Sequence, residues 1–164
     1  MTNRRLIISL QQRGGTKAHH PVITAHARAV MAELAGARLA NTMRLTIKIR
    51  AKVPKKNAQG LCYFRDHSKG STARAKHYTI VLDRGRSLRS QLSTLTHEIQ
   101  HAVQMAQGRL AVRTTKAKGR AWYWRPQGHV GASICYTVEE MPAWADRPWE
   151  QEAMAAEANL KHLI

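Results

Sequence analysis

The chain has 164 residues and a mass of 18.5 kDa, enough for one ordinary domain and too few for two, so we expect a single domain over residues 1–164. Its composition (43% hydrophobic, 23% charged, formal net charge +17) excludes a disordered chain. No apolar run approaches the roughly 20 residues that cross a bilayer, so we expect no membrane span. With only two cysteines, Cys62 and Cys135, the chain cannot form a disulfide framework. The N-terminal apolar stretch is broken at Gln11 and is too short for a secretory signal. We therefore expect a cytoplasmic protein.

The first half of the chain is expected to hold one helix and three strands. Alanines and apolar residues at helical spacing predict a helix over residues 21–39. Strict alternation of apolar and polar residues predicts a half-buried strand over 43–52, and shorter apolar runs predict strands over 61–65 and 77–83. Two polar or glycine-containing segments are expected to be loops: 11–20 and 66–76.

The second half is expected to be mainly helical around an irregular segment. Residues 87–107 have helical periodicity, and Gly108 is expected to end this helix. Residues 109–147 show no clear periodicity. Pro148 suits the first position of a last helix, which is expected to run toward Leu163. The order of helix, small sheet, helix, irregular segment and helix is typical of an α+β fold.

The helix predicted over residues 87–107 contains the pattern H-E-x-x-H at His97, Glu98 and His101. Residues four apart lie about 40° apart on one helix face, so both imidazoles can reach one Zn²⁺ at about 2.0–2.1 Å. Glu98 can reach the water at such an ion without binding the ion itself, and can act as a general base. An apolar stripe on the opposite face is expected to pack on the sheet: Leu88, Leu92, Leu95, Ile99, Val103 and Ala106.

A catalytic zinc site needs a third protein ligand and one open position. Glu150 and Glu152 lie in the first turn of the last predicted helix, where acids also stabilise the helix dipole. His129, between two glycines, is a third candidate. Helical phase does not choose between the two glutamates. Tyr123 and Tyr136 are candidates for stabilising an oxyanion.

Residues 97–104 and 148–153 resemble the active-site motifs of compact zincin metallopeptidases, most of all the small SprT-like or gluzincin-type proteins of phages and bacteria. The resemblance covers about residues 77–160. It implies a minimal zincin fold, in which a small, mostly antiparallel sheet packs on the active-site helix between flanking helices. In the related HtpX-type and ImmA-type peptidases the third zinc ligand is a Glu three residues before an Ala, which implies Glu150 here. Met154 stands where those families have an Asp or Asn that supports a ligand.

The motif and the resemblance together predict a zinc-dependent metallopeptidase that acts on protein or peptide substrates. His97, His101 and Glu150 are expected to hold Zn²⁺, and Glu98 is expected to be the general base.

The distribution of charge supports an alternative. Of the 27 lysines and arginines, 25 lie in residues 1–138, whereas six of the ten acids lie in residues 139–164. A surface this basic attracts polyanions, nucleic acid among them. The alternative is therefore a nucleic-acid-associated or virion structural protein that retains a zincin scaffold.

Overall fold

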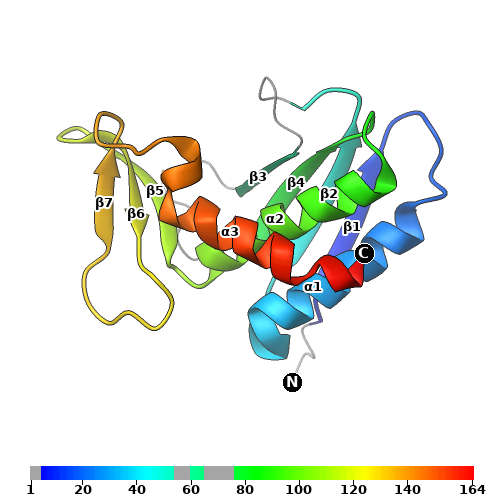
Figure 1. Ribbon diagram of the computed structural model, residues 1–164, viewed down its shortest axis with the longest axis horizontal. Coiled ribbons are helices and arrows are strands. Elements are labelled where there is room, and N and C mark those ends of the chain that lie inside the picture. Colours follow the sequence, from blue (N-terminus) through cyan, green and yellow to red (C-terminus); the bar gives the residue numbers. More distant parts are fainter. Residues whose placement is uncertain (1–4, 54–59, 65–75) are drawn as a thin grey trace.

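Figure 1 shows the computed structural model, which describes residues 5–53, 60–64 and 76–164. Within these ranges, three α-helices accompany two small sheets, which confirms the predicted α+β class: α1 (His20–Ala40), α2 (Leu88–Ala106) and α3 (Pro148–Asn159). Helices α1 and α2 pack against each other over one face of the larger sheet, and α3 crosses in front of α2. The loop expected over residues 66–76 lies, except for its last residue, outside the described residues.

The larger sheet has four strands in the order β1-β2-β4-β3: β1 (Ile7–Gln12), β2 (Arg44–Arg50), β4 (His77–Asp83) and β3 (Gly60–Phe64). Strands β2, β3 and β4 confirm the three predicted strands to within two residues at each end. β1 pairs with β2 in parallel, β2 pairs with β4 in parallel, and only β3 runs antiparallel to its neighbour. The expectation of a mostly antiparallel sheet beside the active-site helix is therefore wrong. The physical reason is that α1 connects β1 to β2 as a crossover, which returns the chain to the same end of the sheet.

Strand β1 is a further correction, because Gln11 and Gln12 belong to it although residues 11–20 were expected to form a loop. The side chains of β1 alternate between exposed and half-buried along the whole strand. An edge strand of this kind buries little apolar area, so its hydrophobic pattern is weak in the sequence.

The smaller sheet occupies the segment over which periodicity predicted no element. Its strands β5 (Leu110–Thr115), β6 (Gly119–Trp124) and β7 (Ile134–Thr137) form an antiparallel meander. The sheet packs on the start of α3 through aromatic rings, because the Trp149 ring lies 6.2 Å from the Trp124 ring and 5.5 Å from the Tyr136 ring, measured between centroids. Short strands with one solvent-facing side carry too few residues for a clear period.

Helix α2 begins and ends as the sequence predicts. The Ser87 side chain accepts a hydrogen bond from the Ser90 amide at 3.2 Å, a typical N-cap. Gly108 has φ +71°, and the amides of Gly108 and Arg109 donate to the carbonyls of Met105 and Gln104. These two bonds form a Schellman motif, which requires a residue with positive φ after the helix.

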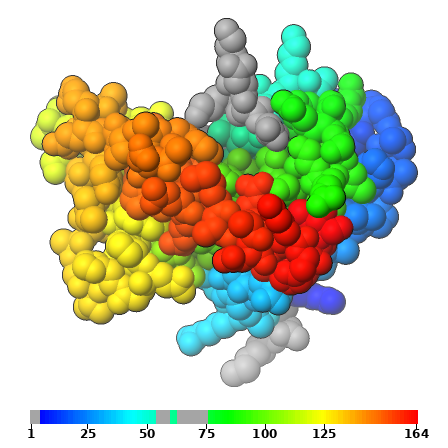
Figure 2. Space-filling view, viewed as in Figure 1, coloured from blue at the N-terminus to red at the C-terminus, as the bar shows by residue number. Residues whose placement is uncertain are grey.

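The core lies between the larger sheet and the helices, and the predicted stripe of α2 is part of it. From Leu92 onward the stripe is buried, and Leu88 is partly buried against the same core. The opposite side of α2 is also covered, because α3 and the segment that follows it run across the middle of the face shown in Figure 2. Helix α2 therefore carries polar side chains that are buried as well. None of the described helices is long and apolar enough to span a membrane.

Candidate metal centre

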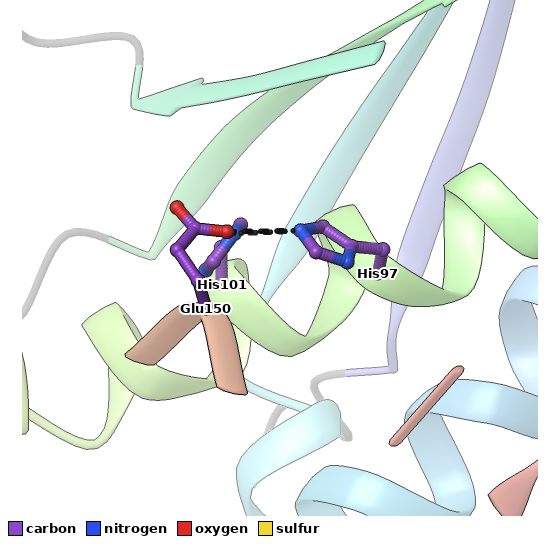
Figure 3. A group of neighbouring side chains, drawn as sticks. All are labelled: His97, His101 and Glu150. Carbon is purple, nitrogen blue, oxygen red and sulfur yellow. Dashed lines mark hydrogen bonds and ion pairs between the residues drawn. The ribbon is translucent and has the colours of Figure 1, made fainter. Parts of the chain in front are cut away.

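Three side chains from two helices converge at the contact between α2 and α3 (Figure 3). His97 and His101 project from α2 one turn apart, and Glu150 lies in the first turn of α3. Glu150 Oε2 is 3.1 Å from His97 Nε2 and 3.2 Å from His101 Nε2, and the two Nε2 atoms are 3.2 Å apart. The structure thus brings together the three residues selected as zinc ligands.

The three atoms form a nearly equilateral triangle with edges of 3.1 and 3.2 Å. Ligand atoms bound to zinc at about 2.0–2.1 Å in a tetrahedral arrangement are separated by about 3.3 Å. The triangle therefore has the size of one face of a tetrahedral zinc site. Two imidazoles and one carboxylate are also a donor set that zinc prefers, and a fourth position would remain for water or substrate.

Both imidazoles present their Nε2 atoms to the centre because each Nδ1 atom has a partner of its own. His101 Nδ1 donates to Gln104 Oε1 at 3.0 Å. The orientation of that amide is set because Gln104 Nε2 donates to the Trp149 carbonyl at 3.0 Å. His97 Nδ1 lies 3.5 Å from Glu157 Oε2. With the ring protons on Nδ1, three acceptor atoms face one another, and such an arrangement needs a proton or a metal cation between them.

In the metal-free protein a proton takes this place. Burial lowers the pKa of His101, but the hydrogen bond to Glu150 and the nearby carboxylate of Glu98 outweigh burial and raise the pKa to about 9. Burial raises the pKa of Glu150, but hydrogen bonds from His101 and His97 outweigh it and lower the pKa to about 2. The site therefore favours positive charge at its centre and negative charge on Glu150.

Glu98 lies on the side of α2 that faces β3. Its side chain is buried, and its carboxylate accepts a hydrogen bond from the Cys62 amide in β3. Burial is the main cause that raises the pKa of Glu98, and the two histidines of the triangle partly offset it. A Cβ built on Gly60 would collide with Thr94 Cγ2 and lie 3.3 Å from Glu98 Oε1, so this approach of β3 to the helix requires glycine.

The two alternative third ligands lie elsewhere. Glu152 forms an ion pair with Arg109, in which Arg109 Nη1 lies 2.9 Å from Glu152 Oε2, and it also accepts a hydrogen bond from Gln100. Burial raises the pKa of Glu152, but the Arg109 guanidinium outweighs it and lowers the pKa. His129 is exposed in the loop between β6 and β7. Within the described part of the chain, the cluster that could hold a metal contains neither of them.

Sequence reasoning did not find Gln104 and Glu157, which hold the two imidazoles. A weak signal exists, since Gln104 follows His97 by seven residues and Glu157 follows Glu150 by seven, so each pair shares a helix face. Glu157 supplies the supporting carboxylate that the resemblance placed at Met154, about one turn later in α3. Ser93 donates a hydrogen bond to this carboxylate, which ties it to α2.

One aromatic residue stacks on a histidine of the triangle, whereas the contacts of the two tyrosines considered as oxyanion stabilisers are with other groups. Trp144, which was not selected from the sequence, stacks over His97 with ring centroids 6.0 Å apart and planes 20° apart, and it is 47% exposed. Tyr136 packs edge-on against Trp149, next to Glu150 in the chain. Tyr123 lies under the Arg113 guanidinium at 5.1 Å. Trp144 therefore forms part of the rim of the site.

Comparison of the chain with protein-family models, with curated proteins and with solved structures gave no significant match.

Proposed function

We propose that the protein is a zinc-dependent peptide hydrolase in which His97, His101 and Glu150 hold the ion. The observation that carries the proposal is the triangle of converging acceptor atoms, whose edges of 3.1 and 3.2 Å fit one face of a tetrahedral zinc site. Gln104 and Glu157 support it, because they fix the imidazoles in the orientation that a metal ligand needs.

Glu98 is the proposed general base. A zinc ion in this site supplies a Lewis acid that polarises the scissile carbonyl and lowers the pKa of water toward about 7. Glu98 accepts the proton of the attacking water and then donates it to the nitrogen of the leaving amine. Because burial raises the pKa of Glu98, its carboxylate is a stronger base than an exposed glutamate, and its protonated form is more populated near neutral pH. The same side chain can therefore accept a proton in the first step and hold it for the second.

The proposal is tested by measuring zinc content and the hydrolysis of casein for the native protein and three variants. Glu98→Gln keeps the shape of the side chain and removes the base, so it should retain zinc and lose activity by about a hundredfold or more. Glu150→Ala should lose both zinc and activity. Glu139→Gln is the matched control, because it neutralises an exposed carboxylate outside the triangle and should retain both.

The two parts of the proposal fail in different ways. A native protein that takes up no zinc after loading would contradict the metal site. A protein that binds zinc in the triangle and yet cleaves neither casein nor a mixed peptide library would contradict the hydrolase, as would a Glu98→Gln variant with native activity.

A second candidate function, nucleic-acid binding, is favoured by the hairpin of β5 and β6. No Asp or Glu occurs in residues 99–138, and two of the hairpin arginines stack on aromatic rings, Arg113 over Tyr123 at 5.1 Å and Arg120 over Trp122 at 5.0 Å. Paired cations and aromatic rings are common where proteins bind single strands. Half-buried Arg125 follows the hairpin, and four exposed cations lie in the hairpin and its turn: Arg113, Lys116, Lys118 and Arg120.

This candidate is tested by the salt dependence of binding to a single-stranded oligonucleotide. Replacing Arg113, Lys116 and Arg120 together by Gln should lower the slope of log K against log salt by about two, since each phosphate contact contributes about 0.7 on single strands. Glu98→Gln should bind as the native protein does. Equal slopes for the triple variant and the native protein would exclude the hairpin as the binding surface.

A further inference from the structure

The outer edge of β1 carries backbone groups that point away from the sheet. β1 is the end strand of the larger sheet, and among the described residues only β2 pairs with it. The Ile7 amide donates to the Met43 carbonyl, and in a parallel ladder alternate residues bond to the same neighbour. The backbone groups of Ile7 and Ser9 therefore face β2, whereas those of Ile8 and Leu10 face outward.

A groove of about 530 Å³ follows this edge, between β1 and α1. Ile8 and Leu10, the residues whose backbone faces outward, line one side with their side chains. The other side is a single stripe of α1, with spacing i, i+3, i+4 and i+7: Pro21, Thr24, Ala25 and Arg28. His20 lies at the end of the groove, where it makes a hydrogen bond of 2.9 Å with Gln12 Oε1. A sheet edge flanked by a helix and an apolar groove is an arrangement to which an extended peptide can add a strand.

Cations lie at both ends of this groove. Arg28 Nη1 donates to the Leu6 carbonyl at 3.4 Å, just before β1 begins. Arg13 and Lys17 are exposed beyond the other end of β1, where Arg84 Nη1 donates to the Arg13 carbonyl at 2.9 Å. No Asp or Glu occurs in residues 5–32. The charge around the groove therefore favours an occupant with acidic residues on both sides of an apolar centre.

We propose that β1 and α1 form a docking site for an extended acidic segment of another protein. The segment adds a strand to the outer edge of β1 and places two apolar side chains, two residues apart, in the groove. Acidic residues that flank them pair with Arg28 at one end and with Arg13 and Lys17 at the other. The site lies at the edge of the sheet opposite β3 and Glu98, so it stands independently of the proposed hydrolase.

The experiment measures fluorescence anisotropy of a labelled, capped peptide, Glu-Glu-Val-Thr-Val-Glu-Glu, titrated with the native protein. Binding should weaken several-fold between low and physiological salt because the flanking charges are exposed. Two further peptides separate the contributions. N-methylation of both valines, which removes backbone donors and hinders strand pairing, should weaken binding about tenfold, and exchange of every Glu for Lys should abolish it.

Variants of the protein locate the binding site. Thr24 is half-buried on the side of α1 that lines the groove, so Thr24→Trp fills the groove. It should weaken binding about tenfold or more while the thermal unfolding midpoint stays near the native value. Arg28→Glu should weaken binding several-fold. Arg38→Glu makes the same change of charge at an exposed position of α1 away from the groove and is the matched control.

Several outcomes would overturn the proposal. Equal affinity for the acidic and the Lys-substituted peptide would show that charge does not select the partner. Equal affinity of the native protein and Thr24→Trp would show that the peptide does not bind in the groove. If light scattering showed concentration-dependent dimers that Thr24→Trp abolishes, and no peptide bound, the occupant would be a second copy of the chain instead. Undetectable binding at millimolar protein concentration would exclude this class of partner.

Discussion

The two edges of the larger sheet differ in whether the polar side chains beside them are buried or exposed. At the β3 edge, His97, Glu98 and Glu150 are buried and His101 is partly buried, and each has specific partners. At the β1 edge, the charged groups are exposed and surround an open apolar groove. Buried polar groups depend on one another, so a single substitution leaves a partner unsatisfied, whereas exposed groups are replaced by water. The comparison predicts that substitutions near α2 and α3 alter stability and metal affinity, and that substitutions near β1 alter only binding.

The largest effect on stability is expected for Arg109→Met. The Arg109 guanidinium is almost fully buried between Glu152 and the Trp124 ring, which lies 5.2 Å away. Its removal leaves the Glu152 carboxylate partly buried without its ion partner, and should lower the free energy of unfolding by about 2–3 kcal/mol. The loss is smaller than for a fully buried ion pair because Glu152 still contacts solvent. Urea unfolding measures the loss. Arg109→Met combined with Glu152→Gln should recover part of it; a double variant no more stable than the single one would show that the carboxylate is not the cause.

A smaller effect, on zinc affinity, is expected for Glu157→Gln and for Gln104→Leu. Glu157→Gln removes the negative charge beside His97 Nδ1, and Gln104→Leu removes the acceptor of His101 Nδ1. Each change should weaken zinc binding by about tenfold to a hundredfold, which competition with a chromophoric chelator measures. Glu140→Gln, a change at an exposed carboxylate, is the control. Native affinity in both variants would show that neither side chain positions a ligand.

The pH dependence of zinc binding follows from the raised pKa of His101. Because this imidazole holds a proton below about pH 9 in the metal-free protein, zinc must displace that proton to bind. Apparent affinity should therefore rise about tenfold per pH unit up to about pH 9, where this dependence ends. Calorimetry in buffers with different ionisation enthalpies should detect the released proton at pH 7. Affinity that is independent of pH between 6.5 and 8.5 would contradict the hydrogen bond between His101 and Glu150.

The smallest effect on stability is expected at the β1 edge. Arg28→Glu should change the free energy of unfolding by about 0.5 kcal/mol or less, because Arg28 is exposed and its hydrogen bond to the Leu6 carbonyl is long. Thermal unfolding of this variant beside Arg38→Glu checks the expectation. If Arg28→Glu lowered the free energy of unfolding by more than about 2 kcal/mol, the expected difference in stability effects between the two edges would be wrong.

The elements with strong local signals could be predicted from the sequence. The apolar stripe, Ser87 and Gly108 define α2. The residues alone left three candidates for the third ligand, and only the family resemblance implied Glu150, which the structure places beside the histidines. The parallel pairing of β1 and β2 could not be predicted, because the exposed side of β1 has no distinct pattern. The roles of Gln104 and Glu157 could not be predicted either, since both depend on how α3 packs against α2, a contact between segments about 50 residues apart in the chain.

The position of Glu150 has a consequence for the second sheet. His97 and Glu150 are 53 positions apart, and β5, β6 and β7 lie entirely within that interval. An ion bound to both residues would hold the two ends of this interval together, which restricts the conformations the meander can adopt on unfolding and so disfavours its local opening. Removal of the metal would therefore open a route for proteases into residues 109–147 before the four-stranded sheet unfolds.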